Sequence, residues 1–332
     1  MDQPTPLRYL SASDVAAAMP TLAERLDLAE ATLRGLAGPA ELPAKIGVHP
    51  RQAGSFAHAM PAYLPGGAVD GSEDRLGMKW VLSFGGNAAL GMPAISALLL
   101  LNDPVTGLST AIIDAGPITA QRTAAVSGVA IRAWAAPADR SRPRAALIGA
   151  GVQGHSHLPV LAHLLPGLDL VVFDRDAARA NALAAAGRGL PGVASVTVAT
   201  SAREAVAGAD VIVTAASFAP PAERQAMTND WLAPNALVVP VDYATMCAAE
   251  VARDAALFAT DHTGQFLANR EAGQFDGYPE PVMIGEALDR PVGRPAGRIV
   301  ATHLGTGLAD VVFGAAILAE AERRGLGTLL AR

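Results

Sequence analysis

Residues 149–154 read Gly-Ala-Gly-Val-Gln-Gly, which is a glycine pattern with the spacing GxGxxG. The apolar run at 145–148 precedes it and predicts a buried strand, and the residues that follow predict a helix. A strand, a tight glycine turn and a helix together form the setting in which this spacing binds the pyrophosphate of a dinucleotide. We therefore predict a nucleotide-binding strand–turn–helix unit that begins near residue 144.

Each residue of this fingerprint has a predicted role in cofactor binding. Gly149 permits the tight turn, Gly151 lets the backbone approach the pyrophosphate, and Gly154 lets the helix pack closely on the strand. Val152 and Gln153 lie in the first turn of the predicted helix, where N–H groups and the helix dipole favour an anion. The alternative is that the glycines only form a turn. The strand before them, the helix after them and a correctly spaced acid favour the nucleotide site.

That acid is Asp174, which follows the second predicted strand of the unit, residues 170–173. It lies 20 residues beyond Gly154, at the position of the carboxylate that binds both ribose hydroxyls of NAD. Its charge would repel the 2′-phosphate of NADP, whereas the neighbouring Arg175 would attract it. The sequence therefore predicts NAD as the cofactor, with NADP as the alternative.

Strand and helix patterns alternate from residue 144 onward. Further strands are predicted at 193–199, 211–214, 236–239 and 256–259. Such alternation predicts a parallel sheet with helices on both faces. We expect residues 264–298 to be irregular and a last helix to span about 306–324.

The part before residue 144 has a different pattern. Strands at 97–101 and 109–113 flank a spacer rich in turn formers and predict a β-hairpin. Helical spacing of apolar residues predicts one helix over 13–37 and another over 119–136. This part of the chain therefore predicts a separate α+β domain.

Composition narrows the class of protein. The chain has 332 residues, 51% of them hydrophobic, which is enough for two domains with their own cores. Its net charge of −6, without a basic cluster, argues against a nucleic-acid partner. The single cysteine, Cys247, fits a reducing cytoplasm. Because the N-terminus lacks a signal-peptide pattern and the run 94–101 is too short to cross a bilayer, we expect a cytoplasmic protein without a membrane partner.

Three cations among apolar neighbours are candidate substrate ligands: Arg51, Lys79 and Arg122. Arginines can bind a carboxylate bidentately, and a lysine can donate a proton to a carbonyl or imine. No metal site is predicted, because His155 and His157, two residues apart on a helix, do not share a face.

Several short motifs follow one another along the chain in a characteristic order. They are Met60-Pro61-Ala62, Gly77-Met78-Lys79-Trp80, Asn87 with Gly91-Met92-Pro93, Asp103-Pro104-Val105-Thr106-Gly107, Ile118-Thr119-Ala120-Gln121-Arg122-Thr123-Ala124-Ala125, the fingerprint, Gly208-Ala209-Asp210-Val211-Ile212-Val213-Thr214, and Gly305 with Asp310. In order and in residue pattern these motifs resemble the ornithine cyclodeaminase/μ-crystallin family, and the resemblance runs from about residue 45 to the C-terminus.

This resemblance implies an α/β fold in which a Rossmann-type, doubly wound parallel sheet is inserted into a discontinuous α+β domain. Residues 1–118 plus 306–332 would form the substrate-binding and dimerisation domain, and 119–305 the dinucleotide-binding domain. The usual assembly in the family is a homodimer. Its shared chemistry is hydride exchange between nicotinamide C4 and the α-carbon of an amino or imino acid.

The resemblance also implies roles for single residues. Arg51, Lys79 and Arg122 would grip the substrate carboxylate, and Lys79 would also serve in proton transfer. Asp242 resembles the family's catalytic aspartate, although a strand-capping role is an equal alternative. The other implied positions are the cofactor contacts Thr123, Thr214, Ala215 and His303, and the substrate contact Leu304.

Three departures from the family pattern bear on the substrate. Met246 replaces a lysine of many relatives, His58 stands where an ornithine site would favour an acid, and Ala94 replaces a common threonine. The missing acid removes a partner for a second ammonium group. We therefore expect an imine or ketimine reductase or an amino-acid dehydrogenase. The alternatives are an ornithine- or lysine-type cyclodeaminase that recycles NAD⁺ and releases ammonia, and a crystallin-like binding protein without turnover.

Overall fold

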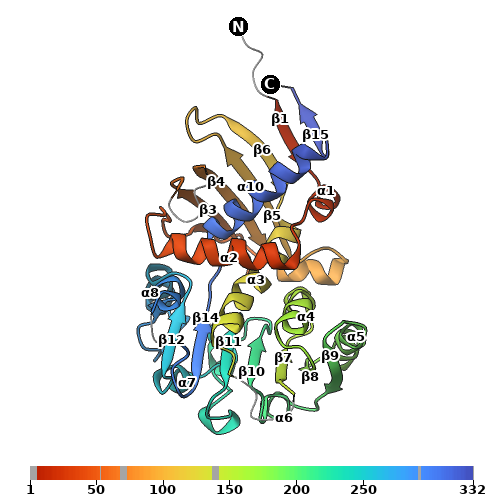
Figure 1. Ribbon diagram of the computed structural model, residues 1–332, viewed down its shortest axis with the longest axis vertical. Helices are drawn as coiled ribbons and strands as arrows, with labels where there is room; N and C mark the ends of the chain where they lie inside the picture. Colours follow the sequence, from red (N-terminus) through yellow and green to blue (C-terminus); the bar gives the residue numbers. More distant parts are fainter. Residues whose placement is uncertain (1–5, 53, 68–72, 137–141, 291–292, 332) are drawn as a thin grey trace. The chain divides into compact units, whose positions relative to one another are not determined.

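The computed structural model describes residues 6–52, 54–67, 73–136, 142–290 and 293–331 (Figure 1). The chain divides into two compact units, Met1–Arg122 with Gly305–Arg332, and Thr123–Leu304. The sequence placed the first boundary at 118/119, four residues earlier. Helix α3 (Gly116–Trp134) is continuous across both positions, so no break in secondary structure marks this boundary.

The first unit is built on a mostly antiparallel sheet. In the described part of the chain this sheet has seven strands in the order β15-β1-β6-β5-β4-β3-β2, and only β1 and β6 pair in parallel. The predicted hairpin is present as β5 and β6. The strands are β1 (Leu7–Leu10), β2 (Ile46–Val48), β3 (Phe56–Leu64), β4 (Arg75–Ser83), β5 (Ile95–Asn102), β6 (Ser109–Asp114) and β15 (Thr328–Leu330).

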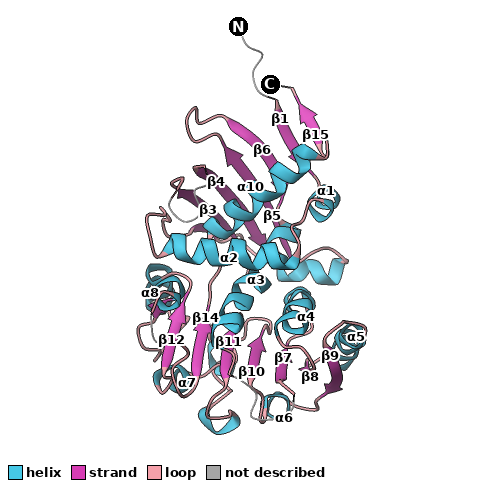
Figure 2. Cartoon of the chain, viewed as in Figure 1, coloured by secondary structure: helices cyan, strands magenta, loops and turns pink. Residues whose placement is uncertain are grey.

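Two helices cover one face of this sheet. Helix α10 (Gly307–Arg323) packs on β3, β4 and β5, and α2 (Leu22–Leu36) packs on α10 (Figures 1 and 2). Packing is close because Gly314 of α10 lies against Leu99, where a Cβ would come within 2.1 Å of Leu99 Cδ2. Side chains alternate along β4, so Lys79 and Val81 are buried beneath the helices while Trp80 is exposed on the other face.

The helix predicted over 13–37 is wrong as a single element. The structure has α1 (Ala12–Ala17) and α2, separated around Pro20. Proline lacks the N–H that a continuing helix needs. Thr21 starts the second helix, because its side chain accepts from the Glu24 N–H while the Glu24 carboxylate accepts from the Thr21 N–H. Ser11 starts the first helix in the same way.

The second unit confirms the predicted doubly wound parallel sheet. Its eight described strands run in the order β13-β12-β14-β11-β10-β7-β8-β9, and each described pair is parallel. The chain winds outward in one direction through β7, β8 and β9 and in the other through β10 and β11. The order therefore reverses between β7 and β10, which is where such sheets bind ligands, at the strands' carboxyl ends.

The elements of this unit follow one another as strands and helices. The strands are β7 (Arg144–Ile148), β8 (Leu168–Phe173), β9 (Val193–Val198), β10 (Val211–Thr214), β11 (Leu237–Pro240), β12 (Leu257–Thr260), β13 (Val282–Met283) and β14 (Ile299–Thr302). The helices are α4 (Val152–Leu164), α5 (Ala177–Arg188), α6 (Ala202–Val206), α7 (Ala249–Arg253), α8 (Thr263–Glu271) and α9 (Ile284–Leu288). Short 3₁₀ turns lie at η1 (Gly85–Leu90), η2 (Pro221–Glu223) and η3 (Asn229–Trp231).

The region 264–298 is more regular than predicted. It contains α8 and α9, and the N-cap of α8 is His262, whose Nδ1 accepts from the Gln265 N–H at 3.1 Å. The sequence pattern missed this helix because histidine is an uncommon N-cap, and Ser, Thr, Asp and Asn are the usual signals.

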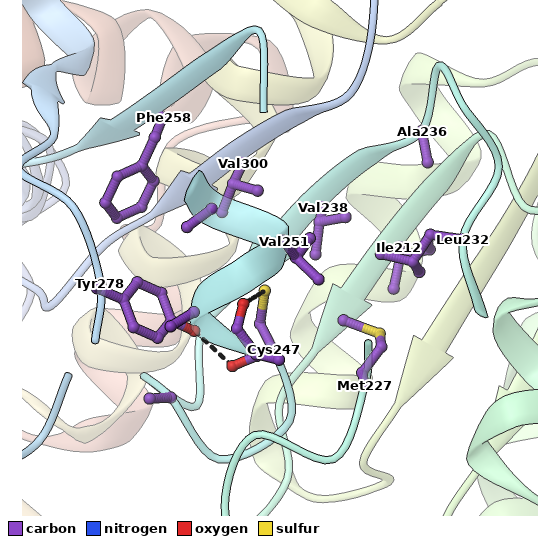
Figure 3. Close-up of a cluster of buried hydrophobic side chains, with 14 of the residues drawn as sticks. Ile212, Met227, Leu232, Ala236, Val238, Cys247, Val251, Phe258, Tyr278 and Val300 are labelled. Carbon is purple, nitrogen blue, oxygen red and sulfur yellow. Dashed lines mark hydrogen bonds between the residues drawn. The ribbon is translucent and has the colours of Figure 1, made fainter. Parts of the chain in front are cut away.

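One apolar core of the second unit is a row of side chains across four parallel strands. Ile212, Val238, Val300 and Phe258 are register neighbours from β10, β11, β14 and β12 (Figure 3). The buried thiol of Cys247 lies in the same cluster, and the Tyr278 hydroxyl donates to its backbone carbonyl. This packing fixes the positions of the strands whose carboxyl ends carry the polar residues described next.

Candidate active site

The glycine fingerprint forms the predicted turn between β7 and α4. Gly149 has φ +101°, and a Cβ there would come within 2.3 Å of the Ala215 carbonyl oxygen. At Gly154 a Cβ would lie 2.2 Å from the Gly149 carbonyl oxygen. At Gly151, in contrast, a Cβ would meet no heavy atom within 4 Å. The first and third glycines therefore serve the fold, while the open space at Gly151 leaves the backbone accessible to a ligand.

The start of α4 has the chemistry of an anion site. Its N-cap, Gly151, has no side chain that could accept a hydrogen bond from the first turn of the helix. The N–H groups of that first turn can therefore bind a phosphate. Val152 is 71% exposed beside it. Among the described residues, the buried Oε1 of Gln153 has no hydrogen-bond donor. An open glycine and unoccupied helix N–H groups fit the pyrophosphate of a dinucleotide at this helix end.

A pocket of about 500 Å³ opens beside the fingerprint. Asp174 forms part of its wall and is fixed there, because its carboxylate accepts from the N–H groups of Ala150 at 2.7 Å and Asp176 at 2.8 Å. Arg175 and Arg179 also line the pocket, and Arg179 Nε lies 3.5 Å from a carboxylate oxygen of Asp176. The predicted ribose-binding acid is thus held at the edge of a pocket that begins at the glycine turn.

Asp242 follows β11, and its carboxyl group is buried. Its Oδ1 accepts from the Thr214 hydroxyl at 2.8 Å, and its Oδ2 accepts from the Ala216 N–H at 3.1 Å. Only 2% of the residue is exposed, and this burial raises its pKa to about 7, against the opposing effect of those two hydrogen bonds. A carboxyl group with such a pKa can exchange a proton near neutral pH. This proton affinity favours the acid–base role of Asp242 over a strand cap, and that role stays a prediction.

Two further side chains hold the backbone that follows β14. The Leu304 N–H donates to the carboxylate of Asp261, with 3.1 Å to each oxygen, and the Leu304 carbonyl accepts from the Tyr243 hydroxyl at 3.2 Å. Tyr243 has φ +58°, a conformation that is costly for a residue with a bulky side chain. The backbone is thus strained at the residue next to Asp242, and Leu304 is held at both its N–H and its carbonyl group.

The first unit holds a buried cluster of charges. Lys79 Nζ lies 2.5 Å from Asp310 Oδ2, and Arg122 Nε donates to Asp310 Oδ1 at 3.2 Å. The three residues come from β4, α3 and the first turn of α10, and each is at most 5% exposed. Two cations share one carboxylate, so the cluster carries one net positive charge when Lys79 is protonated. That charge suits a single anionic substrate group.

Burial also changes the proton affinity of Lys79. It lowers the pKa of the ammonium group to about 7, while the nearby Asp310 carboxylate acts in the opposite direction. Lys79 can therefore gain or lose a proton near neutral pH. Gly305, with φ +76°, makes room for the neighbouring guanidinium, because a Cβ there would lie 2.7 Å from Arg122 Nη1.

The structure gives the locations of several further predicted site residues. Arg51 is exposed in the loop after β2, and His58 lies on β3, where it stacks on Phe56 at 4.3 Å. Thr123 is buried on α3, and His303 and Leu304 are buried after β14. Their contacts with cofactor or substrate stay predictions, as do those of Thr214 and Ala215.

Sequence reasoning missed Asp261, Tyr243 and the role of Asp310 as counter-ion. Asp261 carried a usable signal, because it follows an apolar strand directly, as Asp174 does. Asp310 is the one acid in the apolar stretch 307–319, where a buried carboxylate needs a cation partner. Tyr243 gave no such signal, because a positive φ at tyrosine cannot be read from sequence.

Comparison with known proteins decides the family. The model of the ornithine cyclodeaminase/mu-crystallin family matches residues 9–298. This chain belongs to that family. Within it, the nodulation efficiency protein NfeD of Rhizobium meliloti is 34% identical over 333 residues, and the match covers 98% of both chains. The ketimine reductase mu-crystallin of Mus musculus is 32% identical, covering 54% of this chain and 52% of its own.

Solved structures agree with this family fold. A lysine cyclodeaminase described as recognising L-lysine, L-ornithine and L-2,4-diaminobutyric acid superposes with a TM-score of 0.81 at 26% identity, covering 98% of this chain and 96% of its own. The Δ1-pyrroline-2-carboxylate reductase of Thermococcus litoralis, solved with NADH and L-proline, gives 0.79 at 24% identity, covering 97% and 100%. The second likeness concerns the fold alone.

None of the helices in the described part of the chain combines the length and apolar character needed to cross a membrane. Nor do three His, Cys, Asp or Glu side chains gather anywhere in the described ranges to hold a metal ion.

Proposed function

We propose that this protein is an NAD(H)-dependent oxidoreductase that reduces an α-imino acid or oxidises the corresponding amino acid. The observation that carries the proposal is Asp242. It is a buried carboxyl group with a pKa near neutrality, and it lies on the same parallel sheet as the glycine fingerprint. A group that exchanges protons near pH 7 is what the substrate nitrogen requires in either direction.

The remaining chemistry is assigned to the other polar residues. When bound, the nicotinamide cofactor exchanges a hydride with the substrate α-carbon. Lys79 and Arg122 bind the substrate carboxylate through the net positive charge that Asp310 leaves uncompensated. Asp242 gives its proton to the imine nitrogen during reduction and takes one from the amine during oxidation.

Asp174 supports NAD over NADP. Its carboxylate is fixed by two backbone N–H groups at the pocket wall, where it can accept from ribose hydroxyls and repel a 2′-phosphate. The exposed Arg175 keeps NADP as the alternative. Separate titrations with NADH and NADPH distinguish the two, and tighter binding of NADPH would reverse this assignment.

A direct assay tests the function. The protein is incubated with NADH and a panel of cyclic imino acids, and with 2-oxo acids plus ammonia or methylamine, while NADH absorbance is followed. We expect NADH oxidation with at least one imino acid. Ammonia release from ornithine or lysine without net NADH change would instead identify a cyclodeaminase. NADH binding without turnover of any substrate would identify a binding protein.

The fingerprint glycines give a matched pair of predictions. Gly151→Ala should leave the melting temperature unchanged, because a Cβ there meets nothing, yet weaken NADH binding about tenfold or more by blocking the pyrophosphate. Gly149→Ala should lower the melting temperature, because it combines a positive φ with a 2.3 Å clash. Thermal unfolding and NADH fluorescence titration measure both effects. Unchanged NADH affinity in Gly151→Ala would exclude the pyrophosphate from this turn.

We also propose that the protein is a homodimer that pairs through the uncovered face of the first sheet. Strands β4, β5 and β6 place apolar residues on this face in register, with Trp80 opposite Leu98. The residues are Met78, Trp80, Leu82, Leu98, Leu100 and Ile112. Leu98 is 47% exposed and Trp80 37%, and a contiguous apolar surface of this kind indicates a protein interface.

The proposed dimer interface predicts that a single charged residue placed in it changes the oligomeric state. Leu98→Asp should convert the dimer to a monomer, because burying an unpaired carboxylate in an apolar interface is costly. Val105→Asp is the control, since Val105 is 91% exposed in the turn between β5 and β6. Sedimentation equilibrium gives the mass of each variant. A wild-type monomer, or a Leu98→Asp variant that remains dimeric, would contradict the proposed interface.

A further inference from the structure

The pocket beside the fingerprint has a second polar wall, apart from the one that carries the ribose acid. Asp174 belongs to the part of the lining that follows β8. Strands β8 and β10 lie on either side of β7 in the sheet, so the fingerprint turn lies between their carboxyl ends (Figure 1). The part of the lining that follows β10 consists of Ala216, Ser217, Ala219 and Glu223.

The charged side chains of this pocket fall into two groups. The carboxylate of Asp174 accepts from two backbone N–H groups, and that of Asp176 accepts from two N–H groups of α5 and lies 3.5 Å from Arg179 Nε. Arg175 and Glu223, in contrast, are exposed and have no hydrogen-bond or ion-pair partner among the described residues. The carboxylate of Glu223 is therefore an acceptor that a ligand can use.

The backbone holds Glu223 in the pocket wall. Glu223 is the last residue of η2, its N–H donates to the Pro220 carbonyl at 2.9 Å, and two consecutive prolines restrict the chain before it. Gln225 follows with φ +61°, while its side chain donates to the Asp276 carbonyl at 2.9 Å and accepts from the Ala249 N–H at 2.8 Å. A positive φ at such a residue persists only where the surroundings fix it. The Glu223 side chain therefore begins from a defined position.

The rest of the lining suits a flat ring. The fingerprint is assigned the pyrophosphate and Asp174 the adjoining ribose, so the base attached to that ribose falls to the remaining part of the pocket. Alkyl and thioether groups pack well against the faces of an aromatic ring, whereas the edge of the ring needs polar partners. The apolar residues of the lining are Ile148, Phe173, Ala216, Ala219 and Met246.

The chemistry of a carboxylate limits which edge of a base it can bind. An ionised carboxyl group only accepts hydrogen bonds. The base of NAD is adenine, whose 6-amino group donates while its ring nitrogens accept. Hypoxanthine has an oxygen acceptor in place of that amino group, so its 6-position would face Glu223 with one acceptor against another. A carboxylate at the base end of the pocket therefore favours a 6-amino purine.

We propose that Glu223 determines specificity for the base by accepting a hydrogen bond from the 6-amino group of adenine. The proposal rests on the proposed function and adds recognition of the base to its cofactor site. Asp174 distinguishes a free ribose from its 2′-phosphate, and Glu223 distinguishes a 6-amino purine from a 6-oxo purine. Specificity for the dinucleotide is thus divided between the segments that follow β8 and β10.

Fluorescence titrations with three reduced dinucleotides test this assignment. Wild-type protein should bind NADH about tenfold more tightly than reduced nicotinamide hypoxanthine dinucleotide, since a hydrogen bond to a charged group is lost. In Glu223→Gln this ratio should fall to about one, because a carboxamide can accept from a 6-amino group and donate to a 6-oxo group. NADPH is the third ligand, and its affinity relative to NADH should not change. Thermal unfolding should be unaltered, because the Glu223 carboxylate has no partner among the described residues.

Glu280→Gln is the matched control, because Glu280 is an exposed acid of the same unit that does not line the pocket. It should keep the tenfold ratio. Equal affinities in the wild type, or a tenfold ratio that persists in Glu223→Gln, would overturn the assignment. So would tighter NADPH binding in Glu223→Gln with an unchanged ratio, which would make Glu223 a group that repels the 2′-phosphate. Absence of binding by all three dinucleotides would defeat the proposed function as well. The expected ratios without turnover of any imino acid would defeat only the proposed reaction.

Discussion

Asp242→Asn is expected to lower kcat/KM for imino-acid reduction by about 10²- to 10⁴-fold, the usual contribution of a general acid–base group. NADH binding should survive, because the asparagine oxygen can accept from the Ala216 N–H while its NH₂ group donates to the Thr214 hydroxyl oxygen. Steady-state kinetics and NADH titration on the same preparations measure the two effects. A variant that retained full turnover would remove Asp242 from the mechanism.

The pH dependence of the wild-type enzyme should have opposite signs in the two directions. The buried carboxyl group has a pKa raised to about 7, so it is protonated below that pH and ionised above it. Reduction needs the protonated form, so its kcat/KM should fall as the pH rises through about 7. Oxidation needs the carboxylate, so its kcat/KM should rise over the same interval. Identical profiles in both directions would contradict the assigned role.

The raised pKa of Asp242 also predicts how the free energy of unfolding depends on pH. Because the folded-state pKa of Asp242 lies above that of an unfolded aspartate, its contribution to stability is present at low pH and is lost as the pH rises through about 7. Asp242→Asn removes this titration, so the variant should gain stability relative to wild type between pH 5 and pH 8. Denaturant unfolding at both pH values measures the difference.

Asp210→Asn is the control for both experiments. Asp210 directly precedes β10, at the amino end of this strand, whereas Asp242 follows the carboxyl end of β11. The Asp210 carboxylate accepts from the Arg144 N–H at 2.8 Å. The substitution is chemically identical and also removes a charge next to a backbone N–H. It should leave the pH profiles unchanged, which would locate the effect at Asp242.

The parallel sheet was predictable because its strands are buried on both faces. Residues 211–214 are apolar without interruption, and all four are buried in β10. Strand β1 and the edge strand β15 escaped prediction, because each is short and is stabilised by pairing with a strand far away in sequence. Such pairing leaves no local pattern. The division of the first helix was visible only through Pro20, whose effect was outweighed by the apolar spacing around it.

The candidate site was predictable where a residue type implies its own chemistry. Asp174 and Asp242 follow apolar strands, and the position after a parallel strand is where such folds place ligands. The hydrogen bonds that join Ser127 to His157 and His303 could not be predicted, because the three residues lie on separate segments and only the fold brings them together. Asp310 was noted for the family motif, yet its pairing with two cations emerged only from the packing of α10 on β4.

Asp310→Asn is expected to have the largest effect on stability. It leaves Lys79 and Arg122 buried without their shared carboxylate, and removing one partner from a buried ion pair costs about 3–5 kcal/mol in the free energy of unfolding. Glu320→Gln is the control on the same helix. Its carboxylate pairs with Arg323 at 2.6 Å on the surface, where a pair is worth about 0–1 kcal/mol. Equal losses in the two variants would contradict a buried ionic cluster.

A second substitution separates stability from substrate binding. Lys79→Met removes one cation but leaves the Arg122–Asp310 pair, so unfolding should change less than in Asp310→Asn while KM for the imino acid rises. The cost of Asp310→Asn should be larger at pH 6 than at pH 8. Without the Asp310 carboxylate the pKa of Lys79 falls further below its wild-type value of about 7, so the folded wild-type protein binds this proton at pH 6 more readily than the folded variant does. In the double variant Lys79→Met/Asp310→Asn this pH difference should disappear, because the titrating amine is gone. If it persists, the titrating group lies elsewhere and Lys79 is not the proton-exchanging partner of Asp310.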